Sequence, residues 1–386
     1  RFFQQTFDRL YQNGQMPLKM TVTDNSMVVD GLFDQRSYGL ALFHQTTLRR
    51  IFTDGLSLTL GLRYEHEEQK LDYSSSAILN LSFIRPPAPM PIPVSVPALI
   101  EGNSNQNFGV FLPKAALQYQ FSETGKVFFT SARGYKAGGY NIQMFSDLVQ
   151  SAMMGGMPGQ GGGSAGAGND VSETISYKPE FNWNNELGFS GELVPEKLSL
   201  NAALFYIESR DQQIVQFAGT TGFGRIARNA AKSYSTGIEA LLAYSTFNNL
   251  TASLNWGYTY SRFIEYNDGR EDYKDKFVPF VPRNTVSASV RHKKEINSNW
   301  LNSITTFLQY SGAGKIYWTE SNNISQNYYS VLDGSVSFNF PIFELSLWFT
   351  NITDAKYNTF YFETLGTGIA QLNNPFNTGV TLRFVL

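Results

Sequence analysis

The most constraining feature of this sequence is an alternation of apolar and polar residues that continues for about ten residues at a time. Between Leu250 and Ser261 the even positions are Leu, Ala, Leu, Trp, Tyr and Tyr, and the odd positions are small or polar. Residues 56–64, 198–206, 332–340 and 380–386 alternate in the same way. Successive side chains of a strand point to opposite faces, whereas a helix repeats every 3.6 residues. The pattern therefore predicts β-strands with one apolar and one polar face.

The length of these segments fits a lipid bilayer. A membrane-crossing strand uses roughly 9–11 residues, whereas strands of soluble sheets average about 5–6. The sequence has no run of 18 apolar residues, which excludes a transmembrane helix. A closed barrel is the other structure that pairs every backbone polar group in lipid. A soluble β-sandwich or propeller also alternates and stays open as an alternative.

Composition supports strands with two unlike faces. Aromatic residues make up 15% of the chain and charged residues 16%. Tyrosines end several segments at one rim, as an interfacial girdle would: Tyr64, Tyr206, Tyr258, Tyr260 and Tyr310. The net charge of −2 argues against nucleic acid as a partner. Because the chain has no cysteine, it has neither a disulfide nor a thiolate metal site.

Short and long connections alternate along the chain. Short turns are predicted at residues 52–55, 122–125, 194–197, 247–249 and 341–342. The longest connections are a Pro-rich segment at 78–105 and a Gly- and Met-rich segment at 141–180. Bacterial outer-membrane barrels have short periplasmic turns and long external loops. We therefore predict that both long segments are external loops.

Counting with this polarity predicts thirteen strands, near residues 36–51, 56–77, 106–121, 126–139, 181–193, 198–217, 225–246, 250–267, 283–294, 300–320, 328–340, 343–362 and 375–386. Bacterial single-chain barrels have even strand numbers, and an open edge is not tolerated in lipid. Because the chain begins with Arg1 rather than Met, we expect a preceding part to supply the missing strands. Residues 1–35 are expected to form an external loop with the end of a preceding strand, and residues 36–386 the barrel portion.

Five segments resemble, in order, motifs of iron-complex TonB-dependent receptors. They are GYKAGGYN within residues 131–141, KPE at 178–180 followed by NELGF at 185–189, NAAKSYSTGIE at 229–239, VPFVPRN at 278–284 and NITDAKY at 351–357. Together they cover about residues 36–386. Residues 374–377 depart from the family's proline–arginine pattern before the last strand.

The resemblance implies an all-β, antiparallel transmembrane β-barrel of which about 13 strands lie in this chain, from a total of 22, with the plug domain missing. It implies uptake of a ferric siderophore or similar scarce nutrient across the outer membrane of a Gram-negative bacterium, rather than an enzymatic reaction. The expected partners are outer-membrane lipids, a small-molecule ligand and the TonB–ExbB–ExbD energising complex. A surface lipoprotein or companion chain is a further partner. A passive plugless porin and an outer-membrane barrel enzyme are the alternatives.

Aromatic residues of the predicted outer loops are the candidate ligand contacts: Tyr140, Phe145, Tyr317 and Trp318. Aromatic faces suit siderophores, haem and sugars. Polar residues on the other strand face are expected to line the lumen: Arg63, Glu65, Asn201, Asn255, Arg291, Asp333 and Asn339. Both sets are predictions of place and leave the ligand open.

The sequence offers no catalytic residue and no resident metal or cofactor, although a ferric chelate could be the transported ligand. Its three histidines, His44, His66 and His292, lack a nucleophile motif nearby. His66 lies among Glu65, Glu67 and Glu68, which suggests either a cation site or a solvated strand end. Methionines of the 141–180 segment suggest a soft-metal site, an apolar lid or a disordered loop. The Gly161–Gly168 tract lacks the Lys-Ser/Thr of a phosphate loop.

Overall fold

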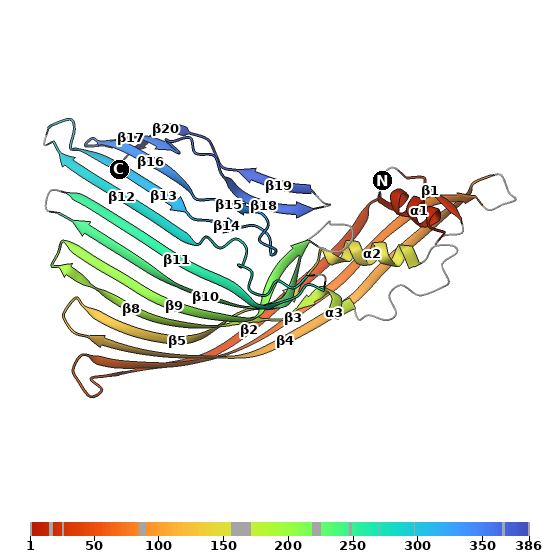
Figure 1. Ribbon diagram of the computed structural model, residues 1–386, viewed down its shortest axis with the longest axis horizontal. Helices are drawn as coiled ribbons and strands as arrows, with labels where there is room; N and C mark the ends of the chain where they lie inside the picture. The colour runs from red at the N-terminus through yellow and green to blue at the C-terminus, as the bar shows by residue number, and fades with distance from the viewer. Residues whose placement is uncertain are drawn as a thin grey trace.

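One antiparallel sheet of 14 strands dominates the structure, a computed structural model (Figure 1). The described residues are 2–14, 18–24, 27–84, 90–155, 171–217, 225–246, 249–269, 271–296, 298–364 and 367–384. Within these ranges no helix is long and apolar enough to cross a membrane. The predicted all-β, antiparallel class is confirmed.

Each of the thirteen predicted strands has a counterpart in the sheet. Twelve of the fourteen strands follow one another in the order β3, β4, β5, β8 to β13, β16, β17 and β20; β2 pairs with β3, and β1 (Lys19–Val22) pairs with the far end of β3. The long strands are β2 (Val29–Arg49), β3 (Leu56–Ile84), β4 (Ile92–Gln120), β5 (Lys126–Lys136), β8 (Glu180–Val194), β9 (Leu198–Phe217), β10 (Arg225–Ser245), β11 (Leu250–Tyr266), β12 (Asn284–Glu295), β13 (Ser303–Ala313), β16 (Tyr329–Asn339), β17 (Phe343–Thr350) and β20 (Asn377–Phe384). The connections contain three separate two-stranded sheets: β6 (Gly139–Tyr140) with β7 (Ser176–Tyr177), β14 (Ile316–Tyr317) with β15 (Ser325–Gln326), and β18 (Asn358–Thr364) with β19 (Thr367–Leu372).

The strand registers gather the apolar positions on one face. Leu204 pairs with Ile238, and Ile238 pairs with Tyr258. Side chains of this face are exposed although they are apolar, as for Leu204 at 52% and Val380 at 65%. A large exposed apolar surface is unfavourable in water and favourable against lipid. The sheet is therefore built to place this face against hydrocarbon.

The connections sort to two ends, which we name the turn end and the loop end. At the turn end, residues 50–55, 121–125, 195–197 and 340–342 join neighbouring strands by short segments (left in Figure 1). Phe52 and Glu196 adopt left-handed backbone angles there, with φ of 67° and 58°. The turn predicted at 247–249 lies partly outside the described residues. The predicted sorting of short and long connections is confirmed at the described joints.

The predicted loop at 78–105 is wrong, because it is the end of a hairpin. Strands β3 and β4 pair without a register shift from Leu56 and Tyr119 to Phe83 and Ile92. Proline lacks an N–H donor and is confined to strand edges. Pro93 and Pro97 are tolerated because β4 pairs with β5 only over residues 114–120. The proline content was therefore misinterpreted as a loop signal; residues 85–89 of that segment lie outside the described residues.

Of the interpretations of residues 141–180, the disordered loop does not hold for their described first part. Helix α2 (Met144–Gly155) packs on the long hairpin beside α1 (Phe2–Gln12), and α3 (Val171–Ile175) follows. A buried cluster joins α1, α2 and the hairpin: Phe3, Phe7, Met20, Ala77, Leu79, Leu81, Val96, Ala98, Val149 and Met153. Met153 is fully buried in it, so this methionine fills the core. Met157 and the Gly161–Gly168 tract lie outside the described residues.

Three other predicted boundaries differ from the structure. The strand predicted at 300–320 ends at Ala313, and the one predicted at 343–362 ends at Thr350. Asn351 stops the latter with φ of 49°, and its side chain donates to the carbonyls of Ala355 and Asn374 at 3.0 and 3.1 Å. At the other end of the chain β2 already begins at Val29. The division of the chain at residue 35 stays a prediction.

Leu79→Ala should loosen the helical cluster without disturbing the sheet. Leu79 is 1% exposed between the hairpin and the helices, and a cavity at such a site costs about 2–5 kcal/mol. Hydrogen exchange of α1 and α2 should accelerate, while β9 to β12 keep their protection. Ile78→Ala is the matched control, because Ile78 is 56% exposed on the opposite face. Unchanged protection of α1 in Leu79→Ala would show that the cluster does not hold the helices.

Candidate functional site

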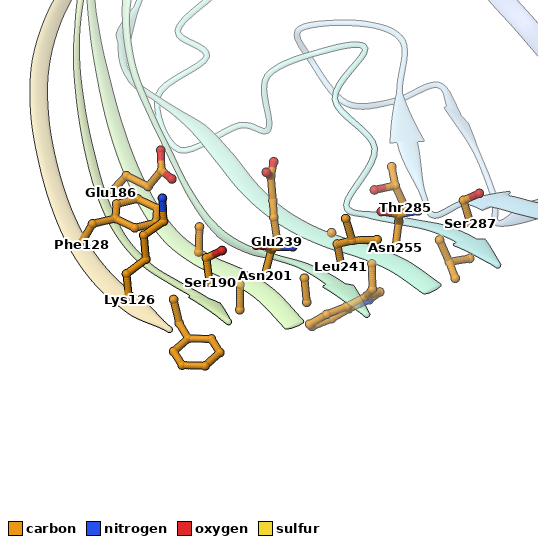
Figure 2. A pocket seen from close by; sticks show the side chains of 17 residues that line it. Lys126, Phe128, Glu186, Ser190, Asn201, Glu239, Leu241, Asn255, Thr285 and Ser287 are labelled. Atoms are coloured by element: carbon orange, nitrogen blue, oxygen red, sulfur yellow. The ribbon is translucent and has the colours of Figure 1, made fainter. Parts of the chain in front are cut away.

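The polar face of the sheet is concave and carries rows of side chains that the strand registers align. One row runs through Lys126, Ser190, Asn201, Leu241, Asn255 and Ser287. A hollow of about 580 Å³ lies along this wall, lined from β5 and β8 to β12. Figure 2 shows the labelled side chains, Glu186 and Glu239 among them, on the side toward which the sheet curves. This wall is the candidate lumen surface.

Two carboxylates of the wall have no partner. Within the described residues, neither Glu186 nor Glu239 makes a hydrogen bond or ion pair through its side chain, and Lys126 nearby makes none. Glu186 is half-buried and Glu239 is exposed. A charge at either position is more stable with a partner or with water. The wall is thus charged and open to contact by a polar surface. The lumen-facing prediction agrees with the register, which places Asn201, Asn255 and Asp333 on polar rows.

The carboxylates around His66 already have side-chain partners in the protein. Glu65 pairs with Arg63 at 2.7 Å, and Glu68 pairs with Lys70 at 2.9 Å. Glu67 accepts hydrogen bonds from Ser37 and Gln69. In the described ranges no group of three or more His, Asp or Glu side chains could hold a metal ion. The carboxylates are therefore already paired, mainly with side chains two residues away on β3.

Tyr140 and Phe145 come together in one cluster at the loop end. The Tyr140 hydroxyl donates to the carbonyl of Gln69 at 3.0 Å. The Phe145 ring contacts Phe33 and Tyr73 at centroid distances of 5.0 and 4.7 Å. Both candidates are buried, Tyr140 at 8% and Phe145 at 1% exposure. In this conformation they attach the α2 connection to the hairpin, and ligand contact by them stays a prediction.

Tyr317 and Trp318 lie in a second aromatic cluster between β11 and β15. The Tyr317 ring stacks on Phe277 at 5.2 Å and 8°. Trp318 is buried and meets Phe280 edge-on at 5.5 Å, and Phe280 stacks on Phe360 at 5.6 Å. The indole N–H of Trp318 has no hydrogen-bond partner in the described part of the chain. The structure thus separates the four candidates into two loop clusters.

Sequence reasoning missed the side-chain amides that attach the loops to the wall. The Asn229 side-chain amide donates to the carbonyls of Lys178 and Asp211 at 2.8 Å each. The Lys178 N–H in turn donates to the side-chain oxygen of Asn229 at 2.6 Å. Asn141 bonds both the N–H and the carbonyl of Ala227. These residues lie in three of the recognised motifs. The motifs were therefore the available signal, and their asparagines have a structural role.

Glu320 is an unusual titratable group in the loop between β14 and β15. Burial raises the pKa of its carboxyl above the ordinary value, and the negative charges of Asp268 and Glu363 raise it further. A backbone hydrogen bond acts in the opposite direction. The same loop is held by Asn322, whose side chain bonds the backbone of Phe277 in both directions. The folded loop therefore favours the protonated form of Glu320 more than water does.

Comparison with known proteins gives one family. A family model described as "TonB dependent receptor-like, beta-barrel" matches residues 2–352. The pesticin receptor of Yersinia enterocolitica serotype O:8 / biotype 1B is 25% identical over 332 residues, which are 86% of this chain and 42% of that protein. The pesticin receptor of Yersinia pestis is 24% identical over the same shares. The chain spans about two fifths of the length of these relatives.

Solved structures show the same fold. The ferric yersiniabactin uptake receptor of Yersinia pestis superposes with a TM-score of 0.66 and 22% identity, over 92% of this chain and 47% of that one. A siderophore receptor of Acinetobacter baumannii gives a TM-score of 0.56 and 14% identity, over 91% and 56% of the two chains. The likeness to these structures concerns the fold.

The pH dependence of the β14–β15 loop follows from Glu320. Because its pKa is raised in the folded state, protonation stabilises the loop fully below the unfolded pKa, and this stability is lost as pH rises through the folded pKa. Hydrogen exchange of residues 316–326, corrected for the intrinsic rate, should therefore show easier opening at higher pH. Glu320→Gln should remove this dependence, and Glu123→Gln at the turn end should keep it. A loop whose opening does not change with pH in the wild type contradicts the assignment.

Proposed function

This chain belongs to the TonB-dependent receptor β-barrel family, located in the outer membrane of Gram-negative bacteria, and we propose that it serves in uptake of a ferric siderophore or a similar scarce nutrient. The observation that carries the proposal is the pairing of an apolar convex face with a polar, charged concave wall. That arrangement suits a barrel with a polar occupant inside. It does not suit a soluble sheet, whose apolar face would be buried.

The occupant that we propose for the wall is a plug domain. Glu186 and Glu239 present unpaired carboxylates to the lumen side, where a plug and its waters would satisfy them. A plug that fills the lumen must move for cargo to pass. Energy for that movement would come from the TonB–ExbB–ExbD complex of the inner membrane, as the family name implies.

The ligand class is supported by the relatives and by the loops. One relative with a solved structure is described as a ferric yersiniabactin uptake receptor and another as a siderophore receptor. We propose that the two loop clusters that contain Tyr140 and Phe145, and Tyr317 and Trp318, contribute the ligand contacts. Phe280, beside Trp318, is 48% exposed and offers an accessible aromatic face. Aromatic faces bind the flat ring systems of many iron chelators.

Growth under iron limitation tests the function. A strain that lacks the gene should fail to grow on its ferric siderophore, and the complete gene should restore growth only when TonB is present. Energised transport explains this dependence, because a plugged lumen does not pass a large chelate by diffusion. Restored growth in a TonB-deficient strain would favour a passive porin. Restored growth on unchelated iron alone would reject siderophore uptake.

Trp318→Ala tests the second loop cluster. Removing the buried indole leaves Phe280 unsupported, and loss of an aromatic contact in a binding site costs about 1–3 kcal/mol. Ligand affinity, measured by fluorescence quenching on the purified receptor, should fall roughly 5- to 150-fold. Trp300→Ala is the matched control, since Trp300 is 66% exposed beside Phe340 at the turn end. Equal affinity of both variants would place the ligand elsewhere.

A further inference from the structure

The convex face of β9 to β11 carries a ladder of tyrosines at the loop end. Tyr206 stacks with Tyr234, and Tyr234 contacts Tyr260, at centroid distances of 6.3 Å each. Toward the turn end the same face continues with exposed Leu204 and Leu254. Tyrosine prefers the boundary between hydrocarbon and headgroups. The ladder therefore marks the level of the lipid headgroups on this wall.

Arg262 occupies the next position beyond the ladder on the same face. Its register partner is Tyr234, and the alternation of β11 places it in line with Tyr258 and Tyr260. The guanidinium carbon lies 4.9 Å from the Tyr260 ring centroid and 4.5 Å from that of Phe277. The planar group thus contacts two aromatic rings, which meet edge-on at 5.5 Å, at headgroup level.

Arg283 brings a second guanidinium to the same rings. Its carbon lies 4.8 Å from the Phe277 centroid and 5.7 Å from that of Tyr260. One of its terminal nitrogens donates to the Tyr258 hydroxyl at 3.4 Å. Arg262 of β11 and Arg283, which directly precedes β12, therefore converge on the same two rings. We name these two residues the arginine pair.

The charge of the arginine pair is uncompensated. In the described ranges no carboxylate oxygen lies within 4.0 Å of either guanidinium. The Nε atom of Arg262 is buried and has no hydrogen-bond partner. Two neighbouring cations, in contrast, have a carboxylate partner. Glu208 pairs with Arg210 at 2.9 Å and with Lys232 at 3.9 Å. An uncompensated pair of half-buried donors is a site for an anion.

The site is rigid before any ligand arrives. Phe277 stacks on Tyr317, and its backbone N–H and carbonyl are both bonded by the Asn322 side chain at 2.7 and 2.9 Å. A fixed ring fixes the guanidinium groups that stack on it. Ordering two long side chains in advance lowers the entropy cost of binding.

We propose that the arginine pair binds a phosphate group of an anionic lipid in the outer leaflet. Guanidinium groups match phosphate geometry with paired N–H donors. The level of the tyrosine ladder and the exposed leucines beside it favour a phosphate that carries acyl chains over a free ion. The proposed site faces lipid, on the opposite side of the wall from the lumen hollow, and Phe277 links it to Tyr317 of the second loop cluster.

The test uses receptor purified from its complete gene in a neutral detergent and stripped of lipid. A fluorescent, diphosphorylated lipid A is titrated onto it, and the same lipid after phosphate removal is the comparison. The intact lipid should bind at least ~10-fold more tightly. Arg262→Gln combined with Arg283→Gln should weaken it about 30-fold, because each basic residue near a membrane surface contributes about fivefold. Inorganic phosphate at millimolar concentration should displace little of it.

Controls separate the site from general charge and from folding. Arg291→Gln removes an arginine that stacks on Phe307 of the concave wall, and lipid affinity should stay within about twofold. Phe277→Leu keeps both charges and removes the stacking ring, so affinity should fall while the heat-modifiable gel mobility of a folded barrel persists. Wild-type affinity in the folded double variant or in Phe277→Leu overturns the proposal. Equal binding of the dephosphorylated lipid, or full displacement by inorganic phosphate, also overturns it.

Discussion

The structure depends on one constraint: in hydrocarbon every backbone N–H and carbonyl needs a partner within the protein. Long antiparallel ladders satisfy it, and twelve consecutive strand pairings from β2 to β20 supply them. The two-residue period follows directly, because each ladder gives one face to lipid and one to the lumen. The outer edges of β2 and β20 find no partner in the described part of the chain.

At the loop end backbone groups do not all need a strand partner, since water is available there. Its connections are held by side-chain amides, with Asn229 joining the Lys178 segment to β10 and Asn141 joining the α2 connection to Ala227. Aromatic pairs such as Phe145 with Tyr73 complete the attachment. The loops that carry the proposed ligand contacts are therefore packed structures with defined anchors. Binding at them costs less ordering entropy than binding at free loops.

Alternation predicted the strands well, because its cause is local and each strand repeats it. It failed where tertiary context reversed a local signal. Pro93 and Pro97 read as loop residues, yet an unpaired stretch of β4 tolerates them. Met153 suggested a lid, yet α1 and the hairpin bury it. The anchoring role of Asn229 was likewise invisible, because a hydrogen bond to Lys178 depends on the fold of both segments.

The β3–β4 hairpin has a mechanical consequence. Its ladder runs unbroken from Leu56 at the turn end to Phe83 near the tip, and each strand has 29 residues. A bilayer takes up only about 10 of them. The remaining residues form a long two-stranded extension that continues the membrane wall with no break in the β3–β4 ladder. A push on its helical tip would bend the wall below it, so the hairpin converts events far above the surface into strain at the membrane.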